Sequence, residues 1–279
     1  MRSSALLLVF VLQACTTSPL TGRDQFLLVS DSTAVSQSAA AYTQMMADLG
    51  KKKQIETGTP RADKVKEMTD RLVKQAVRVR PDSAKWAWEV QVINDPKTVN
   101  AFCMAGGKMA IYTGMWEKLK ATDDEIAQVM GHEIAHALAD HTRERMSIAM
   151  TTAAATTAAA IAIGSRDSGP GAGLALTGAQ LAAVLAIQLP NSRESESEAD
   201  QIGIELAARA GYDPKAAVTL WDKMGKEGGG PPEFLSTHPA PQNRAARLAQ
   251  LGKQVTPLYL AARVGTASDS DKLITFPRK

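Results

Sequence analysis

Two histidines four positions apart constrain this chain more than any other feature. They belong to the segment His132-Glu133-Ile134-Ala135-His136. On an α-helix, residues four apart lie on one face, so both imidazoles can direct a nitrogen at one metal ion about 2.0 Å away. Glu133 projects about 100° round the helix, where it can reach a water on the metal without ligating the metal. The segment therefore requires a helix, and it requires a further ligand from elsewhere in the chain.

The sequence before the histidines predicts where this helix begins. Thr122 and Glu125 have the spacing of a capping box, in which each side chain binds the backbone N–H of the other residue. Acidic residues at this end also suit the positive end of the helix dipole. Apolar residues continue at helical spacing, and we expect the helix to run past Asp140 toward Arg145.

A second helix has to supply the third ligand, and one acidic stretch can do so. It contains Glu194, Glu196, Glu198 and Asp200. Glu196 and Asp200 lie one turn apart on a face that continues through Gly203 and Ala207, where small residues permit close packing on the first helix. The pair would provide a ligand and a carboxylate that orients a histidine. Spacing does not choose among the three glutamates, and an exposed acidic helix start also fits Glu194 and Glu198.

Two other arrangements of a metal site fit less well. His141 lies nine positions after His132, on the opposite face of a continuous helix, so a solvated or capping role suits it better. A metzincin site would need Gly at position 139 and His at position 142, where this chain has Ala139 and Thr142.

The composition favours a single helix-rich domain. Aromatic residues make up 5% of the 279 residues and the hydrophobic share is 44%, which suits close-packed helices better than a β-sandwich. Residues 86–93, 101–104 and 108–113 are typical of strands. The expected fold class is α+β, mostly α-helical, with a small antiparallel sheet beside the active-site helix. The net charge of +3 comes from interspersed charges, so no nucleic-acid partner is expected.

The N-terminus predicts export and lipid attachment. Arg2 precedes an apolar run at residues 5–12, which has the length of a signal-peptide core and is too short to span a bilayer. The run leads to Ala14 and Cys15, which resemble a bacterial lipobox, although an ordinary secretory signal is the alternative. We expect a lipid on Cys15 and a location at the periplasmic face of the outer membrane. Acylation there would leave Cys103 without a disulfide partner.

These features divide the chain into four parts. We expect a lipoprotein signal peptide at 1–14, a polar tether at 15–38, a metallopeptidase domain at 39–252 and a C-terminal tail at 253–279. Within the domain, residues 148–189 are rich in Ala and Thr, which contribute little to membrane insertion. A packed or lid-forming helical pair is favoured there, and a membrane-contacting lid or a transmembrane hairpin is the alternative.

Together these motifs resemble those of the zinc metallopeptidase family typified by CAAX prenyl protease, a gluzincin family, and within it the bacterial periplasmic lipoproteins of the LoiP and BepA type. The matching residues are His132-Glu133-Ile134-Ala135-His136, Glu196-Ser197-Glu198-Ala199-Asp200, Ser236-Thr237-His238-Pro239 and Arg244. The resemblance extends to about Leu251. It implies a zincin-like domain with one Zn²⁺ per subunit, in which Glu196 is the third ligand and Asp200 its outer partner.

The resemblance also implies roles for two later residues. The family histidine at the position of His238 lies over the site, where it stabilises the oxyanion or blocks the metal in latent enzymes, so His238 is a candidate catalytic or inhibitory residue. Arg244 is a candidate substrate or oxyanion contact. Without the resemblance, the two would be a loop histidine and a solvated helix charge. Residues 105–112 resemble the edge strand on which an extended substrate pairs.

The function that follows is that of a membrane-tethered zinc endopeptidase. Zinc would activate a water, Glu133 would act as general base, and the substrates would be unfolded or misassembled cell-envelope proteins. Outer-membrane assembly machinery is a candidate partner. A second hypothesis is a lipoprotein chaperone or scaffold whose zinc site is plugged by His238. A third is that the Ala-rich residues 148–189 span the membrane.

Overall fold

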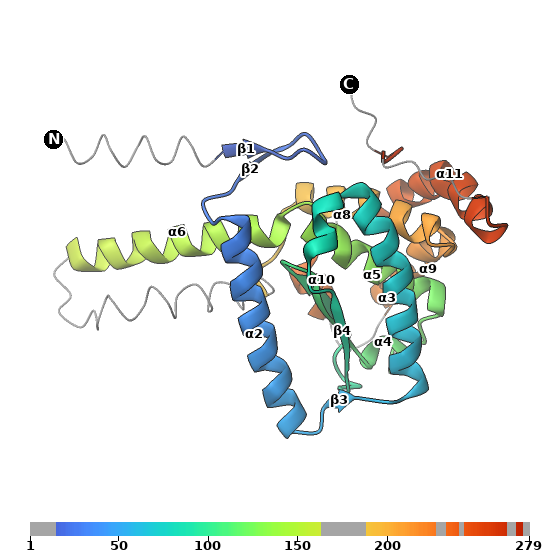
Figure 1. The fold of residues 1–279 in the computed structure, drawn as a ribbon, viewed down its shortest axis with the longest axis horizontal. Coiled ribbons are helices and arrows are strands. Elements are labelled where there is room, and N and C mark those ends of the chain that lie inside the picture. Colours follow the sequence, from blue (N-terminus) through green and yellow to red (C-terminus); the bar gives the residue numbers. More distant parts are fainter. Residues whose placement is uncertain (1–14, 163–187, 227–232, 240–242, 267–271, 276–279) are drawn as a thin grey trace.

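Helices make up most of the computed structural model, and a small sheet lies among them (Figure 1). The structure describes residues 15–162, 188–226, 233–239, 243–266 and 272–275. The predicted signal peptide and most of the predicted lid at 148–189 lie outside these residues. Among the described helices, none is both long and apolar enough to cross a membrane.

Helix α5, Asp123–Leu138, lies at the centre of the domain and carries the two histidines. The predicted capping box is present: Glu125 accepts from the Thr122 N–H at 2.8 Å, and Thr122 accepts from the Glu125 N–H at 3.3 Å. The predicted extension past Asp140 is wrong, because Asp140 has a left-handed φ of 58°. The chain turns there and begins a separate helix, α6, His141–Ala162.

Two helices pack on α5 and form the core with it. Helix α3, Pro60–Val79, begins with Thr59 as N-cap and Pro60 in its first turn, and its apolar face is buried. Helix α8, Arg193–Arg209, begins with Ser192 as N-cap. The largest fully buried side chains of this core are Phe234, Leu72, Met109, Ile111, Met115, Ile126, Met130, Ile134 and Leu138.

Helices α5 and α8 approach each other through glycines. A Cβ at Gly203 would lie 2.7 Å from the backbone N and Cα of His132, and a Cβ at Gly131 would lie 2.8 Å from the Gly203 carbonyl oxygen. The predicted close packing on the small face of α8 is therefore confirmed. It brings the acidic start of α8 against the histidines.

The sheet beside α5 has the order β3-β4-β6-β5. Its strands are β3 Ile55–Glu56, β4 Glu89–Ile93, β6 Lys108–Tyr112 and β5 Ala101–Met104. The predicted place of the sheet is confirmed, but its pairing is mixed, because β4 and β6 are parallel. After β4, the chain crosses to the outer position of the sheet and forms β5. A tight turn then leads to β6, which lies between β4 and β5. The edge strand beside α5 is therefore β5, and the predicted edge at 105–112 is wrong.

The N-terminal segment, which was predicted as a tether at 15–38, is packed on the domain. Strands β1 Cys15–Thr17 and β2 Asp24–Phe26 pair with each other, and α2 already begins at Asp31 and runs to Lys51. The buried Gln25 donates to the Ala139 carbonyl at the end of α5, at 2.7 Å.

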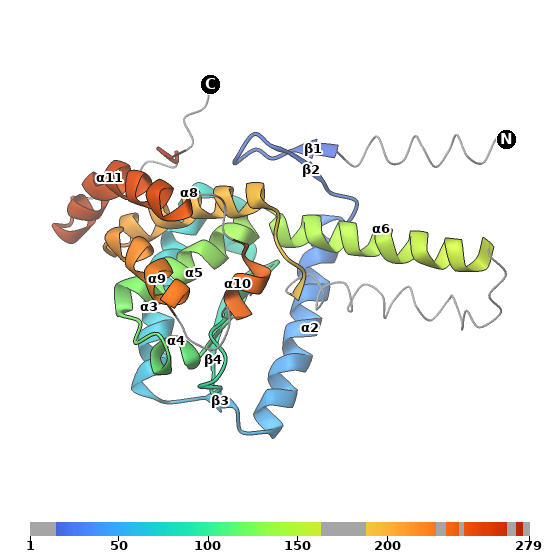
Figure 2. The same cartoon turned by 180° about the vertical axis from the view of Figure 1, so that it is seen from behind.

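The C-terminal part, which was predicted as a tail from 253, is also packed on the domain. The remaining elements are η1 Pro81–Lys85, α4 Gly114–Glu117, α9 Lys215–Lys226, α10 Glu233–Thr237 and α11 Arg244–Arg263. Helix α11 covers α8 and α9, and Figure 2 shows α9 and α11 at the side of the molecule opposite α6. Beyond α11, Thr275 is buried and its backbone N–H donates to Glu205 of α8 at 2.9 Å.

Candidate metal centre

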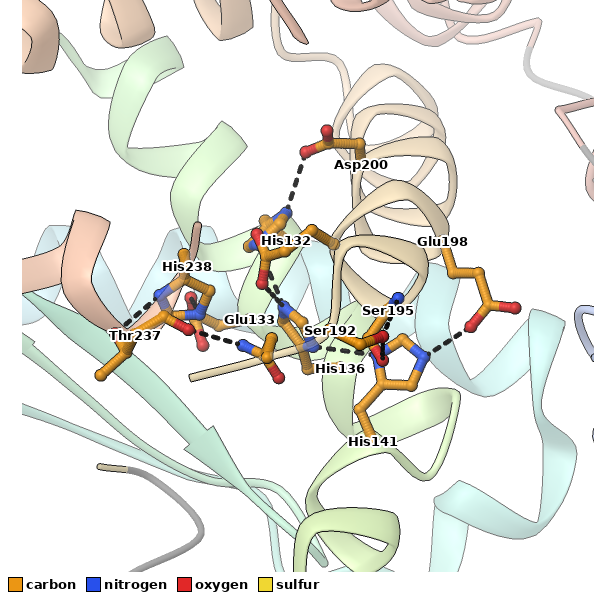
Figure 3. A network of polar contacts seen from close by, with 12 residues as sticks. His132, Glu133, His136, His141, Ser192, Ser195, Glu198, Asp200, Thr237 and His238 are labelled. Carbon is orange, nitrogen blue, oxygen red and sulfur yellow. Dashed lines mark hydrogen bonds and ion pairs between the residues drawn. The ribbon is translucent and has the colours of Figure 1, made fainter. Parts of the chain in front are cut away.

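Four elements bring the predicted site residues together, and Figure 3 shows His132, Glu133, His136, Asp200 and His238 among them. Helix α5 carries His132, Glu133 and His136, and α8 carries Glu196 and Asp200. His238 follows α10, and Arg244 is the first residue of α11. All seven are buried. Cys15 lies apart from them in β1, and its lipidation stays a prediction.

Three side chains converge with the spacing of metal ligands. The Nε2 atoms of His132 and His136 are 3.1 Å apart. Glu196 places Oε2 at 3.4 Å from the His132 Nε2 and Oε1 at 3.3 Å from the His136 Nε2. Ligands at about 2.0–2.1 Å from a tetrahedral zinc ion are about 3.3–3.4 Å apart, so the separations of the two imidazole nitrogens and the Glu196 carboxylate oxygens are close to those of such a site.

The donor set also calls for a cation. The Nδ1 of His132 lies 3.2 Å from the Asp200 carboxylate, which accepts but does not donate, so the proton of a neutral imidazole belongs on Nδ1 and leaves a lone pair on Nε2. This lone pair faces a second imidazole nitrogen and a carboxylate. Buried acceptors in mutual contact are costly without a positive partner. Glu196 Oε1 accordingly accepts no protein hydrogen bond.

Arg244 neutralises the acidic residues of α8 rather than facing outward. Its Nη1 donates to Glu196 Oε2 at 3.0 Å, and its Nη2 donates to Asp200 Oδ1 at 2.6 Å. The guanidinium stacks on Trp221, with the ring centroid 3.5 Å away. This geometry supports a positioning role for Arg244, whereas its predicted contact with substrate stays a prediction.

His238 lies over the two histidines and beside Glu133. Its Nε2 is 3.2 Å from Glu133 Oε1, and its ring stacks on Phe234 at 4.2 Å between centroids. Four ligand atoms lie within 4.8 Å of one another, one each from His132, His136, Glu196 and His238. The His238 Nδ1 is 3.1 Å from the Phe234 carbonyl oxygen, which can only accept, so the lone pair of a neutral ring is on Nε2. Burial lowers the pKa of His238 to about 3, which keeps the ring neutral.

Glu133 is placed next to the ligands without taking part in their cluster. Its side chain is 3% exposed, and its Oε1 accepts no protein hydrogen bond. Burial raises the pKa of the Glu133 carboxyl to about 8, and the nearby charge of Glu196 adds to this shift.

Two residues of the site were missed by the sequence reasoning. His141 is buried with its Nδ1 at 2.9 Å from the His136 Nδ1, and Glu198 accepts at 2.8 Å from the other side of the His141 ring. The expected solvated His141 is wrong because the turn at Asp140 carries the ring back toward α5. The exposed helix start applies to Glu194 but not to Glu198. The one signal in the sequence was Asp140 itself, a residue type that tolerates the left-handed conformation.

Comparisons with known proteins agree with this geometry. The mitochondrial metalloendopeptidase OMA1 of Schizosaccharomyces pombe is 32% identical over 238 residues, which cover 83% of this chain and 65% of that protein. The corresponding enzyme of Bos taurus is 30% identical over 285 residues, which cover 97% and 52%. The β-barrel assembly-enhancing protease of Escherichia coli is 30% identical over 183 residues, which cover 64% and 37%. The chain thus spans about one third to two thirds of these relatives.

The chain also matches a model of a whole protein family. The model described as peptidase family M48 matches residues 60–251, which include α5, α8 and His238. This range ends where the resemblance of the motifs was expected to end. Because it covers more than half of the chain, the protein belongs to peptidase family M48, a family of zinc metallopeptidases.

Proposed function

We propose that this protein is a zinc endopeptidase of the cell envelope that cleaves unfolded or misassembled proteins. The observation that carries the proposal is the convergence of His132, His136 and Glu196 beside the unpaired oxygen of Glu133. The three residues would hold one zinc ion through two imidazole nitrogens and a carboxylate, the donor set of a gluzincin site.

The side chains around the ion have separate tasks. When bound, zinc lowers the pKa of a water and polarises the scissile carbonyl. Glu133 accepts the proton of the attacking water and returns it to the leaving amine. Burial raises the pKa of this carboxyl, so it holds a proton taken from the water more readily than an exposed glutamate would. Asp200 keeps the His132 proton on Nδ1, and Arg244 holds Glu196 in place.

Strand β5 is the candidate binding edge for an extended substrate. It is the outer strand of the sheet on the side of α5, which carries Glu133. An extended peptide can add to such an edge through backbone hydrogen bonds, which do not depend on the sequence bound. This kind of recognition suits unfolded segments, because folded substrates rarely present a free extended strand.

The compartment and the partners are proposed on different grounds. The apolar run before Cys15 supports export and a lipid anchor at the periplasmic face of the outer membrane. The similarity to a protein named for β-barrel assembly supports outer-membrane assembly machinery as a partner. The interspersed charge of the chain supports no role in binding nucleic acid.

A second candidate function, a chaperone or scaffold with a latent zinc site, is favoured by the placement of His238. His238 offers one of four ligand atoms that lie within 4.8 Å of one another, so with the lone pair assigned to its Nε2 it could complete a tetrahedral site. A site with four protein ligands is closed to substrate. Asn191 fixes the residue before His238, because its backbone N–H donates to the Thr237 carbonyl at 2.9 Å.

Casein cleavage and zinc content, measured on the same samples, test the proposal and separate the two functions. The variants are Glu133→Gln, His238→Ala and, as a control, Glu117→Gln, whose carboxylate is exposed and remote from the site. We expect zinc in all proteins and cleavage in all but Glu133→Gln. Cleavage only after His238→Ala would indicate an enzyme that is latent at rest. Equal cleavage by wild type and Glu133→Gln, or zinc-loaded proteins that are all inactive, would contradict the enzymatic function.

The lipid anchor has a separate test. Cys15→Ala should release the protein from the membrane fraction of a Gram-negative host without detergent. A variant that still needs detergent for extraction would contradict the lipid as sole anchor and would favour membrane contact by residues 148–189.

A further inference from the structure

The two histidine ligands differ in what holds their outer nitrogens. His132 Nδ1 meets the carboxylate of Asp200 directly, and Arg244 donates to that carboxylate. His136 Nδ1 meets another histidine, His141, at 2.9 Å. Figure 3 shows the His136 ring between His132 on one side and His141 on the other. The outer contact of His136 is unusual because an imidazole can act as donor or acceptor, whereas a carboxylate can only accept.

The contacts beyond His141 remove this ambiguity. The His141 Nε2 is 2.8 Å from Glu198 Oε2, which accepts only, so a neutral His141 carries its proton on Nε2 and a lone pair on Nδ1. His136 must then donate its Nδ1 proton to His141. The lone pair of His136 is left on Nε2, the atom that faces His132 and Glu196.

The reverse proton arrangement fails at both ends. If His141 donated from Nδ1, the His136 proton would move to Nε2, where it would take the place of a metal ion. A neutral His141 would then turn a lone pair toward Glu198, and two acceptors would face each other at 2.8 Å. Both rings are 1% exposed, so water cannot relieve this contact.

Glu198 is itself fixed by the N-terminal segment. Arg23 donates from Nε to Glu198 Oε2 at 3.0 Å, and its two terminal nitrogens hold Glu144 of α6 at 3.0 and 2.7 Å. The chain of contacts thus ends in a carboxylate and an arginine, as the chain from His132 does. The difference is one interposed imidazole, that of His141.

We propose that His141 and Glu198 are positioning residues for the metal ligand His136. They fix its proton on Nδ1 and its ring plane, so that Nε2 faces the ion. This inference rests on the proposed zinc site. His141, a buried histidine that does not touch the ion, would orient His136 as Asp200 orients His132.

Zinc affinity is the direct test, measured by competition with a chromogenic chelator on the full chain. His141→Phe keeps a buried ring but accepts no hydrogen bond, and we expect affinity to fall by about 10–100-fold, as for the loss of other outer partners of metal ligands. His141→Asn restores an acceptor near the position of Nδ1 and should recover part of the loss. Glu198→Gln keeps shape and acceptor without the charge, so a smaller loss is expected.

Glu205→Gln is the matched control, because Glu205 is a buried carboxylate on the same helix that pairs with Arg209 and contacts no site residue. Its zinc affinity should equal that of the wild type. The visible spectrum of the Co²⁺-loaded protein adds a signature of ligand orientation, which should change in His141→Phe and stay unchanged in Glu205→Gln.

The possible results distinguish this inference from the proposed function. Equal zinc affinity in wild type, His141→Phe and Glu198→Gln would overturn the inference and leave the zinc site intact. Equal losses in His141→Phe and His141→Asn would overturn it too, because the acceptor would then be immaterial. If His141→Phe does not fold, as judged by circular dichroism, Glu198→Gln decides in its place. A wild-type protein that binds no zinc would overturn both the inference and the proposed function.

Discussion

At the scale of single residues, the site is built from buried charges that neutralise one another. Arg244 donates to both Glu196 and Asp200, and its side chain is 3% exposed. Removal of one member of a buried charge pair leaves its partner in a medium that solvates charge poorly. Arg244 therefore contributes to stability most strongly when no metal ion is present to share the compensation.

We expect Arg244→Met to lower the free energy of unfolding of the zinc-free protein by about 3–5 kcal/mol. Saturating zinc should restore part of this loss, because the ion then compensates Glu196. Arg247→Met is the control: Arg247 lies one turn later on α11 and bonds the neutral Ser197. Urea unfolding with and without zinc measures both variants. An equal loss in the two would show that charge neutralisation is not the cause.

At the residue scale, the helix period was enough to place the two histidines on one helical face. His132 and His136 follow from the period alone, because both lie inside one regular helix. Glu196 and Glu198 could not be separated in this way. Both are buried, but on different sides of α8, one against the α5 histidines and one against His141 and Arg23. The choice between the two glutamates depends on what packs on each side of α8. The spacing of residues within one helix carries no information about this packing.

At the scale of elements, the crossing of α5 and α8 sets the distance between the ligands. We expect Gly203→Ala to force the helices apart, because the added methyl would lie 2.7 Å from the His132 backbone. The cost should be about 1–3 kcal/mol in unfolding free energy, together with weaker zinc binding. Gly225→Ala, in α9, is the control, since nothing lies within 4 Å of its added Cβ. Unchanged zinc affinity in Gly203→Ala would contradict the role of this crossing.

The cap of α5 gives a prediction about pH. Burial tends to raise the pKa of Glu125, but Lys223, the Thr122 N–H and Thr219 hold it below the ordinary value of 4.5. A carboxyl with a lowered pKa adds stability above its unfolded pKa, and the gain is lost as the pH falls through the folded value. Between pH 7 and pH 3, the unfolding free energy of the wild type should therefore decrease more than that of Glu125→Gln. Parallel curves for the two proteins would contradict this contribution.

The element predictions went wrong at turns and at strand order. The helix through His141 was predicted because apolar and polar residues keep their period across Asp140, yet one left-handed residue ends α5. The sheet was predicted to be antiparallel, but β4 and β6 pair in parallel. The seven-residue connection after β4 lets β5 take the outer place, which strand composition does not reveal.

At the scale of the whole molecule, both ends of the described chain are packed on the domain. They were predicted as a tether, because the N-terminal segment is polar, and as a C-terminal tail. A few specific contacts hold them nevertheless: Arg23 bridges Glu144 and Glu198, and Glu205 accepts from the backbone N–H groups of Ile274 and Thr275. Such contacts join distant parts of the chain and leave no local pattern.

We expect Arg23→Gln to lower the unfolding free energy by about 1–2 kcal/mol, because Arg23 holds two partly buried carboxylates. Lys51→Gln is the comparison: its pair with Asp48 is exposed, so its loss should have little effect. Limited proteolysis of the segment before α2 should become faster in Arg23→Gln. Equal cleavage rates in both variants would show that Arg23 does not hold this segment.

The central claim is that His132, His136 and Glu196 hold one zinc ion. X-ray absorption at the zinc edge, together with anomalous scattering from crystals of the purified protein, tests it most directly. We predict one zinc per chain, bound by two imidazole nitrogens and a carboxylate from these three residues. A protein that binds no zinc, or zinc placed on other residues, would contradict the account.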